Sequence, residues 1–221
     1  MFVFSNLAIS LDGKIATARR EHFPLGTKAD LTQMIELRKR CDAILMGAAT
    51  LRVYQKPCRV KGADPQPCNV IVSRSLEGLD AAWPFFNTPD VKRILFVSQK
   101  PTAEQEKKFR ESSDVVLLQA GSPIASQIVS ALTKKGIKNL LVEGGGSVMW
   151  DFVSQDLIDE FNVTLTPRIL GGKDAPTLVE GDGFSMQDVR NLKLKSSRVV
   201  GNEIYLVYSK TESRGKDLPS A

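Results

Sequence analysis

One carboxylate followed by three glycines is the group of residues best suited to chemistry in this sequence. Glu143 ends an apolar run at 140–142, and Gly144, Gly145 and Gly146 lead into a stretch with helical spacing. This order predicts a strand, a turn and a helix. Bare glycine backbone lets a ligand approach, and the amides and dipole at a helix N-terminus attract phosphate. The turn therefore predicts a nucleotide-type site, with a tight loop that binds nothing as the alternative.

The common phosphate-loop patterns do not fit this turn. No Gly-Lys-Ser/Thr follows the glycines, so the Walker pattern is missing. The dinucleotide fingerprint fails as well, because its third glycine would fall on Met149. A carboxylate beside an anion site would repel phosphate. We therefore expect Glu143 to face a second ligand.

Three other predicted strands end in polar residues or glycine. The first is followed by Ser10-Leu11-Asp12-Gly13-Lys14, a turn that leaves a lysine just past the strand. The second ends at Gly47, before a short helical stretch that includes Thr50. The third ends at Ser73 and Arg74, a hydroxyl and a guanidinium suited to a monophosphate. Plain polar turns are the alternative interpretation for all three.

Composition narrows the class of protein. The chain has 221 residues, 42% of them hydrophobic and 25% charged, as in ordinary globular domains. No apolar run is long enough to span a membrane, and the N-terminus lacks the basic segment of a signal peptide. Three cysteines without C-x-x-C spacing and one histidine, His22, argue against a disulfide framework, a metal site and a histidine-dependent hydrolase. We expect a cytoplasmic protein with no metal.

Hydrophobic patterning predicts an α/β fold. Buried strands alternate with helices along most of the chain, and a hairpin with a turn at Gly201 and Asn202 closes it, which indicates a mixed, mostly parallel sheet. Residues 1–209 are expected to form one domain, and residues 210–221 a polar tail. Strands are expected at 2–9, 43–46, 70–72, 94–97, 115–118, 140–142, 161–165, 192–200 and 204–208, and helices at 28–40, 101–112, 123–136 and 147–155.

Several boundaries follow from local signals. Thr27 followed by Asp30 resembles a capping box. Ser122 is expected as an N-cap with Pro123 at the first helical position. Proline, glycine and charge predict a long loop from 54 to 67.

Taken together, these junctions resemble the pyrimidine reductase domain of riboflavin biosynthesis, which has a dihydrofolate-reductase-like fold. The resemblance covers almost the whole chain short of its tail. It rests on Ser10-Leu11-Asp12-Gly13-Lys14, Leu37-Arg38, Gly47 to Thr50, Val142-Glu143-Gly144-Gly145-Gly146, Asp159-Glu160 and Pro167 to Gly172.

The resemblance implies NADPH as cofactor, a phosphorylated ribosylaminopyrimidine as substrate, reduction of the ribosyl to a ribityl chain, and a homodimer. Lys14 would lie near the sugar and polarise the imine. Glu143 would accept hydrogen bonds from the pyrimidine, and Arg38 would bind the substrate, plausibly at its phosphate. The cofactor side would comprise Ala8, Gly47, Thr50, Ser73, Arg74, Gly144, Gly145, Gly146 and Ser147, with Arg74 on the 2′-phosphate.

The sequence departs from the family pattern at one place. Where the family usually shows Asp-Asp-Pro, the chain reads Tyr54-Gln55-Lys56-Pro57. Arg59, just beyond this segment, is taken as a further substrate contact. The zinc deaminase signature is absent too. Deamination would come from another polypeptide, or this reductase would act before it.

Two other functions remain open at this point. A reductase of a pterin or folate on the same fold would use Asp30 on the first helix, but would leave Glu143 and Lys14 unexplained. A non-catalytic nucleotide- or RNA-binding module would use the net charge of +5. The basic residues are scattered and not interleaved with aromatics, so we expect no nucleic-acid partner.

Overall fold

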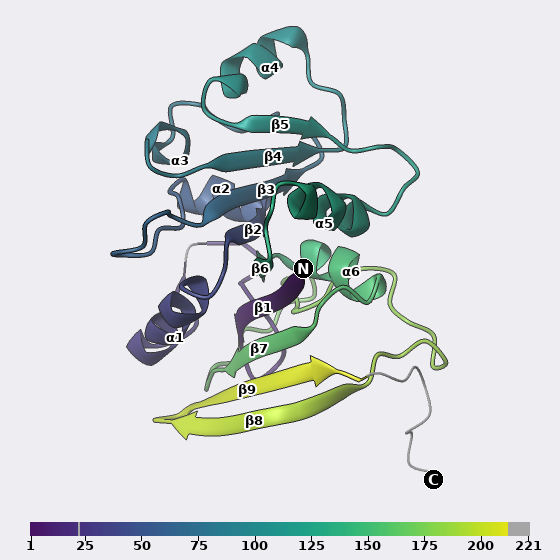
Figure 1. The fold of residues 1–221 in the computed structure, drawn as a ribbon. Coiled ribbons are helices and arrows are strands. Elements are labelled where there is room, and N and C mark those ends of the chain that lie inside the picture. Colours follow the sequence, from purple (N-terminus) through teal and green to yellow (C-terminus); the bar gives the residue numbers. More distant parts are fainter. Residues whose placement is uncertain (22, 212–221) are drawn as a thin grey trace.

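A single mixed sheet organises the computed structural model, which describes residues 1–21 and 23–211. Its strand order is β5-β4-β3-β2-β6-β1-β7-β9-β8 (Figure 1). Pairings from β5 to β7 are parallel, whereas β7–β9 and β9–β8 are antiparallel. The strands are β1 (Phe2–Ile9), β2 (Ala43–Gly47), β3 (Cys68–Ser73), β4 (Arg93–Val97), β5 (Asp114–Leu117), β6 (Asn139–Gly144), β7 (Glu160–Leu165), β8 (Leu192–Val200) and β9 (Glu203–Lys210). The predicted mixed sheet with a terminal hairpin is confirmed.

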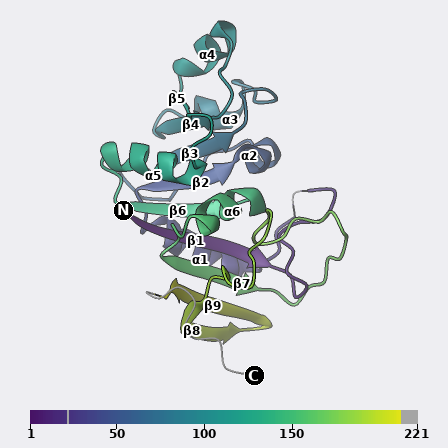
Figure 2. The ribbon, with the colours of Figure 1, turned by 90° about the vertical axis from the view of Figure 1, so that its right-hand side faces the viewer.

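Helices cover both faces of this sheet, which is why its central strands are apolar on both sides. Helices α5 (Ile124–Lys134) and α6 (Gly146–Ser154) pack on one face, as the two views show (Figures 1 and 2). The other face carries α1 (Lys28–Arg38), α2 (Ala48–Tyr54), α3 (Pro84–Asn87) and α4 (Ala103–Arg110).

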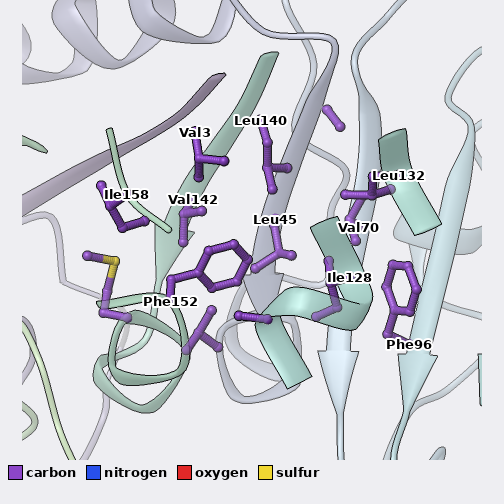
Figure 3. Close-up of a cluster of buried hydrophobic side chains, with 14 of the residues drawn as sticks. Val3, Leu45, Val70, Phe96, Ile128, Leu132, Leu140, Val142, Phe152 and Ile158 are labelled. Carbon is purple, nitrogen blue, oxygen red and sulfur yellow. The ribbon is translucent and has the colours of Figure 1, made fainter. Parts of the chain in front are cut away.

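The larger core lies beneath α5 and α6. Ile128 of α5 and Phe152 of α6 are fully buried against strand residues that include Leu45 and Val142 (Figure 3). Alternate residues of the same strands, such as Leu141, face the second core beneath α1 to α4. Since successive strand residues point to opposite faces, the strands β1, β2, β3, β4 and β6 each contribute buried residues to both cores.

The predicted strand, turn and helix around the three glycines is confirmed. Strand β6 ends at Gly144, Gly145 is the N-cap of α6, and the helix begins at Gly146. Gly144 and Gly145 have φ of +86° and +85°, a region that side chains rarely adopt. The turn therefore needs glycine at both positions.

Helix α1 starts at the predicted place, but without a reciprocal capping box. Thr27 is the N-cap and its side chain accepts from the amide of Ala29. The Thr27 amide donates to the carboxylate of Glu203 on β9, at 2.7 Å, so it is not free for Asp30. Glu203 also accepts from the Thr27 and Tyr205 hydroxyls, which fastens the start of α1 to the hairpin.

Three further boundaries differ by a few residues. Pro123 is the N-cap of α5 and not its first helical residue. Helix α2 extends to Tyr54, so the following loop starts later than predicted. Lys210 ends β9 and pairs with Asp159, so the strand extends past the predicted domain end at 209; residues 212–221 lie outside the described part. No helix among the described residues has the length and apolar character needed to cross a bilayer.

Candidate active site

Four neighbouring parallel strands, β3, β2, β6 and β1, end at one edge of the sheet. The carboxyl ends of such strands are where ligands bind in open α/β sheets. Ser73 ends β3, Gly47 ends β2, Glu143 and Gly144 end β6, and Lys14 follows β1 in a short turn. The structure thus brings most of the residues predicted for substrate and cofactor to the same edge, with Arg59 as an exception.

Glu143 lies at an irregularity in the sheet. Leu45 of β2 pairs with Val142 and the next residue, Met46, pairs with Gly144, so Glu143 is an extra residue in the register. Such bulges re-aim side chains beside functional sites. The Glu143 carboxylate lies on the side of the sheet that α1 covers, where it meets Arg38.

Arg38 and Glu143 form a two-point ion pair across 105 residues of sequence. Arg38 Nε donates to Oε1 at 2.6 Å and Nη2 donates to Oε2 at 2.5 Å. The two side chains are only 15% and 10% exposed. Burial alone lowers the pKa of Arg38, but the bonds to Glu143 raise it above its ordinary range. The pair therefore holds an oriented carboxylate at the site.

The side chains around this pair were not among the predicted site residues. Cys58 Sγ lies 3.9 Å from Glu143 Oε2, and Cys41 Sγ contacts the Arg38 carbonyl at 3.2 Å. Burial, then the charge of Glu143, raises the pKa of each thiol to about 12, so both stay protonated. The same two causes raise the pKa of Tyr54, the last residue of α2. No sequence spacing connects these residues.

The glycine turn presents bare backbone to its surroundings. A Cβ at Gly47 would lie 3.2 Å from Val148, and one at Gly144 would lie 2.9 Å from Leu7, so both are packed closely. Gly145 has open space where a Cβ would be. A turn of this kind at the start of α6 fits the phosphates of a nucleotide.

The Ser10 to Lys14 turn is held by Asp12. Its carboxylate accepts from the Ser10 hydroxyl at 2.6 Å and from the amides of Leu170 and Gly171 at 3.0 and 2.7 Å. These bonds lower the pKa of Asp12 to about 2, and the hydrogen bond from Ser10 has the largest effect. Lys14 Nζ donates to the carbonyl of Ala175 at 3.1 Å. The turn is therefore fixed by residues far along the chain.

Comparison with known proteins shows the family to which this chain belongs. The RibD C-terminal domain family matches residues 1–206. This chain belongs to that family. One relative, the 2,5-diamino-6-ribosylamino-4(3H)-pyrimidinone 5′-phosphate reductase of Methanothermobacter thermautotrophicus, is 30% identical over 94% of this chain and 97% of its own length. The expected function, a reductase of riboflavin biosynthesis, is confirmed.

Solved structures confirm the fold of this RibD-family chain. A pyrimidine reductase-like protein of Corynebacterium diphtheriae superposes with a TM-score of 0.82 at 21% identity, covering 96% of this chain and 92% of the other. A dihydrofolate reductase of Enterococcus faecalis, complexed with NADP(H), gives 0.55 at 14% identity and covers 96% and 97%. The expected dihydrofolate-reductase-like architecture is confirmed. A reductase of this family and fold implies a nicotinamide cofactor.

The other predicted site residues differ in burial and in the edge of the sheet on which they lie. Ala8 is half-buried on β1, Thr50 half-buried on α2, and Arg74 is exposed just past β3. Arg59 forms an ion pair with Asp90, which precedes β4 and so belongs to the opposite edge of the sheet. Its role in substrate binding stays a prediction that this contact does not support.

Replacing Asp12 by Asn should reduce the fall in stability of this reductase at acid pH. The folded-state pKa lies below the ordinary value of 3.8, so Asp12 stabilises the fold above that value and loses this effect as pH falls towards 2. Urea unfolding between pH 5 and pH 2 should show a shallower decline for Asp12→Asn than for wild type. The exposed Asp182, changed to Asn, is the control and should keep the wild-type slope. Equal slopes for all three proteins would contradict the role of Asp12.

Proposed function

We propose that this chain uses NADPH to reduce the ribosylamino group of 2,5-diamino-6-ribosylamino-4(3H)-pyrimidinone 5′-phosphate to a ribitylamino group. The observation that carries the proposal is the buried carboxylate of Glu143, held by Arg38 beside the glycine turn. A carboxylate is an acceptor only, and it has about four lone-pair positions. Arg38 takes two of them, and the Cys58 thiol makes a long contact of 3.9 Å with Oε2. The two positions offered to a ligand therefore include the one that this weak thiol contact occupies.

The diamino form of the pyrimidine suits these two positions. It carries adjacent N–H donors at ring position 3 and at the 2-amino group, whereas deamination replaces that amino group by a carbonyl oxygen. A carbonyl facing Glu143 would place two acceptors against each other. Asn6 lies on the same side of the sheet, and its Oδ1 is buried without a hydrogen-bond partner among the described residues. A ligand donor would satisfy that atom.

The remaining residues divide between sugar and cofactor in this proposal. When bound, the cofactor supplies the hydride that reduces the carbon of the opened ribose attached to nitrogen. Lys14 orients the ribose oxygens and stabilises the negative charge that would develop on the imine nitrogen, which takes up a proton as the carbon takes up the hydride. The turn from Gly144 to Ser147, with Gly47 and Thr50, holds the cofactor phosphates, and Ala8 lines the nicotinamide side. Arg38 orients Glu143, and its contact with the substrate phosphate is a further part of the proposal.

Arg74 is proposed to recognise the 2′-phosphate of NADPH. Its guanidinium is exposed at the end of β3, two strands from the glycine turn. Arg74→Ala should reduce the preference for NADPH over NADH about tenfold, through the KM of NADPH, because one charge-assisted contact is lost. Arg110→Ala on α4 removes an exposed arginine elsewhere and should leave the ratio unchanged. If the Arg74 variant keeps the wild-type ratio, another residue reads the phosphate.

A homodimer formed through β8 is also proposed. This strand lies at the edge of the sheet and is exposed along almost its whole length, with Leu194 at 49% and Val199 at 69%. Unpaired edges with exposed apolar groups pair readily with another strand. Light scattering should give a mass in solution twice the chain mass of 24.3 kDa. The double variant Leu194→Lys/Val199→Lys should have the mass of a single chain. Met186→Lys, at a residue that is 81% exposed, is the control.

The function is tested by following NADPH oxidation with three substrates. The diamino pyrimidinone phosphate should be reduced fastest, and its deaminated uracil form more slowly. Reduction of dihydrofolate alone would favour the pterin or folate alternative, which Asp30 supports because burial raises the pKa of its carboxyl on α1. RNA binding without any NADPH affinity would favour a binding module. The three buried free cysteines suit the reducing cytoplasm, where we place the enzyme.

A further inference from the structure

One segment of the chain touches both the lysine turn and the glycine turn. We call residues 175–180 the strap. At its first end, the Lys14 ammonium donates to the Ala175 carbonyl at 3.1 Å, and the Ile15 amide donates to the Pro176 carbonyl at 2.9 Å. Lys14 also forms an isolated antiparallel bridge with Thr177. The position of Lys14 is therefore set by the strap.

The other end of the strap lies on the start of α6. The Glu180 amide donates to the Gly146 carbonyl at 3.0 Å. A Cβ at Gly146 would lie 2.4 Å from Glu180 Cγ and 2.6 Å from the Thr177 carbonyl, so only glycine admits this contact. Beyond the strap, a Cβ at Gly181 would lie 2.3 Å from the Trp150 ring. The strap is thus pressed against the turn proposed to hold the cofactor.

A negative charge of the protein itself already lies at the start of α6. The N-cap Gly145 has no side chain to cap the helix, and the Glu180 carboxylate is 3.4 Å from the Ser147 hydroxyl. The partial positive charge of a helix N-terminus stabilises one anion there. A phosphate bound at the amides of this helix N-terminus would bring a second negative charge beside Glu180, and the two repel each other.

We propose that Glu180 is a positioning residue that couples cofactor binding to the placement of Lys14. Without ligand, its carboxylate stays at the N-terminus of α6 and keeps the strap and Lys14 in the observed contacts. The cofactor phosphates displace that carboxylate, which loosens the strap and frees the Lys14 ammonium from Ala175 for the substrate sugar. The inference rests on the proposed function, because it needs an anionic cofactor at the glycine turn.

Binding measurements test the coupling. For wild type, the affinity for the diamino pyrimidinone phosphate should rise about tenfold when NADP⁺ is present, within the usual range for coupled sites. NADP⁺ cannot deliver hydride, so no turnover occurs. Glu180→Gln should bind NADP⁺ several times more tightly and the pyrimidine almost equally with or without it. Asp182→Asn removes an exposed carboxylate two residues away and should behave as wild type. Wild-type coupling in Glu180→Gln would overturn the inference.

Hydrogen exchange separates this inference from the proposed function, because it also works without ligands. The Ile15 amide should exchange several times faster in Glu180→Gln than in wild type or Asp182→Asn, while protected amides of β2 and β4 show that the variant is folded. Equal exchange at Ile15 in all three proteins would overturn the role of Glu180. If exchange changes as expected but NADP⁺ and the pyrimidine do not bind wild type, the proposed function is wrong and the strap only holds Lys14.

Discussion

Glu143→Gln is expected to lower kcat/KM for the pyrimidine about 10- to 100-fold and to leave the KM of NADPH nearly unchanged. A hydrogen bond to a charged group contributes about 1.5–3 kcal/mol, and 1.36 kcal/mol corresponds to a factor of ten. Gln keeps the size of the side chain but replaces one acceptor oxygen by a donor. The substrate donors therefore lose one acceptor, while the amides at Gly145 and beyond, which are proposed to bind phosphate, are untouched. Steady-state kinetics with each substrate varied in turn measures both constants.

The same variant should also be less stable. Arg38 would remain almost buried with half of its partner removed, and breaking a buried pair costs about 3 kcal/mol at the lower end of measured values. Glu36→Gln is the matched control, since its pair with Lys39 is 60% and 47% exposed and contributes little. Urea unfolding compares the two variants. Wild-type pyrimidine kinetics in a folded Glu143→Gln protein would remove Glu143 from the substrate site.

Lys14→Met is expected to lower kcat about 10²- to 10³-fold. Loss of one preorganised donor at developing charge has a cost of this size. Methionine nearly preserves the length of the side chain, so the strap contacts made by the backbone of Lys14 and Ile15 should survive. Single-turnover reduction, with enzyme in excess, isolates the chemical step from binding.

Lys173→Met is the control for Lys14. Lys173 is exposed in the loop just before the strap and carries the same charge. Its variant should keep wild-type kcat and change only the weak dependence on ionic strength. If Lys14→Met reduced the pyrimidine at the wild-type rate, the ammonium would have no part in catalysis, and its bond to Ala175 would be structural.

Local features of this fold could be read from the sequence, because neighbouring residues determine them. The turn at Gly144 and Gly145, the end of β2 at Gly47 and the start of α1 at Thr27 were all predicted. The shared edge of the sheet followed from the alternation of strands and helices. Resemblance to a family then supplied roles for these positions, which composition alone could not.

Contacts between distant segments could not be read in the same way. Arg38 was predicted as a substrate residue, but its pairing with Glu143 depends on how α1 crosses the sheet. The bulge that adds Glu143 to the register is set by the geometry of β2 against β6. The strap was invisible for a similar reason: Glu180 reaches Gly146 only because the chain returns over α6 after β7. Such features arise from tertiary packing, which has no local sequence period.

Helix α1 is fastened at both ends by carboxylates from other elements, Glu203 at Thr27 and Glu143 at Arg38. A change at the hairpin can therefore alter the orientation of α1 and, through Arg38, that of the Glu143 carboxylate, which is proposed to bind the pyrimidine. In kinetic measurements this change would be seen as weaker substrate binding, although the altered residue lies far from the proposed ligand site. Variants found by activity screens at the start of β9 should accordingly be checked for helix orientation before they are assigned to the catalytic centre.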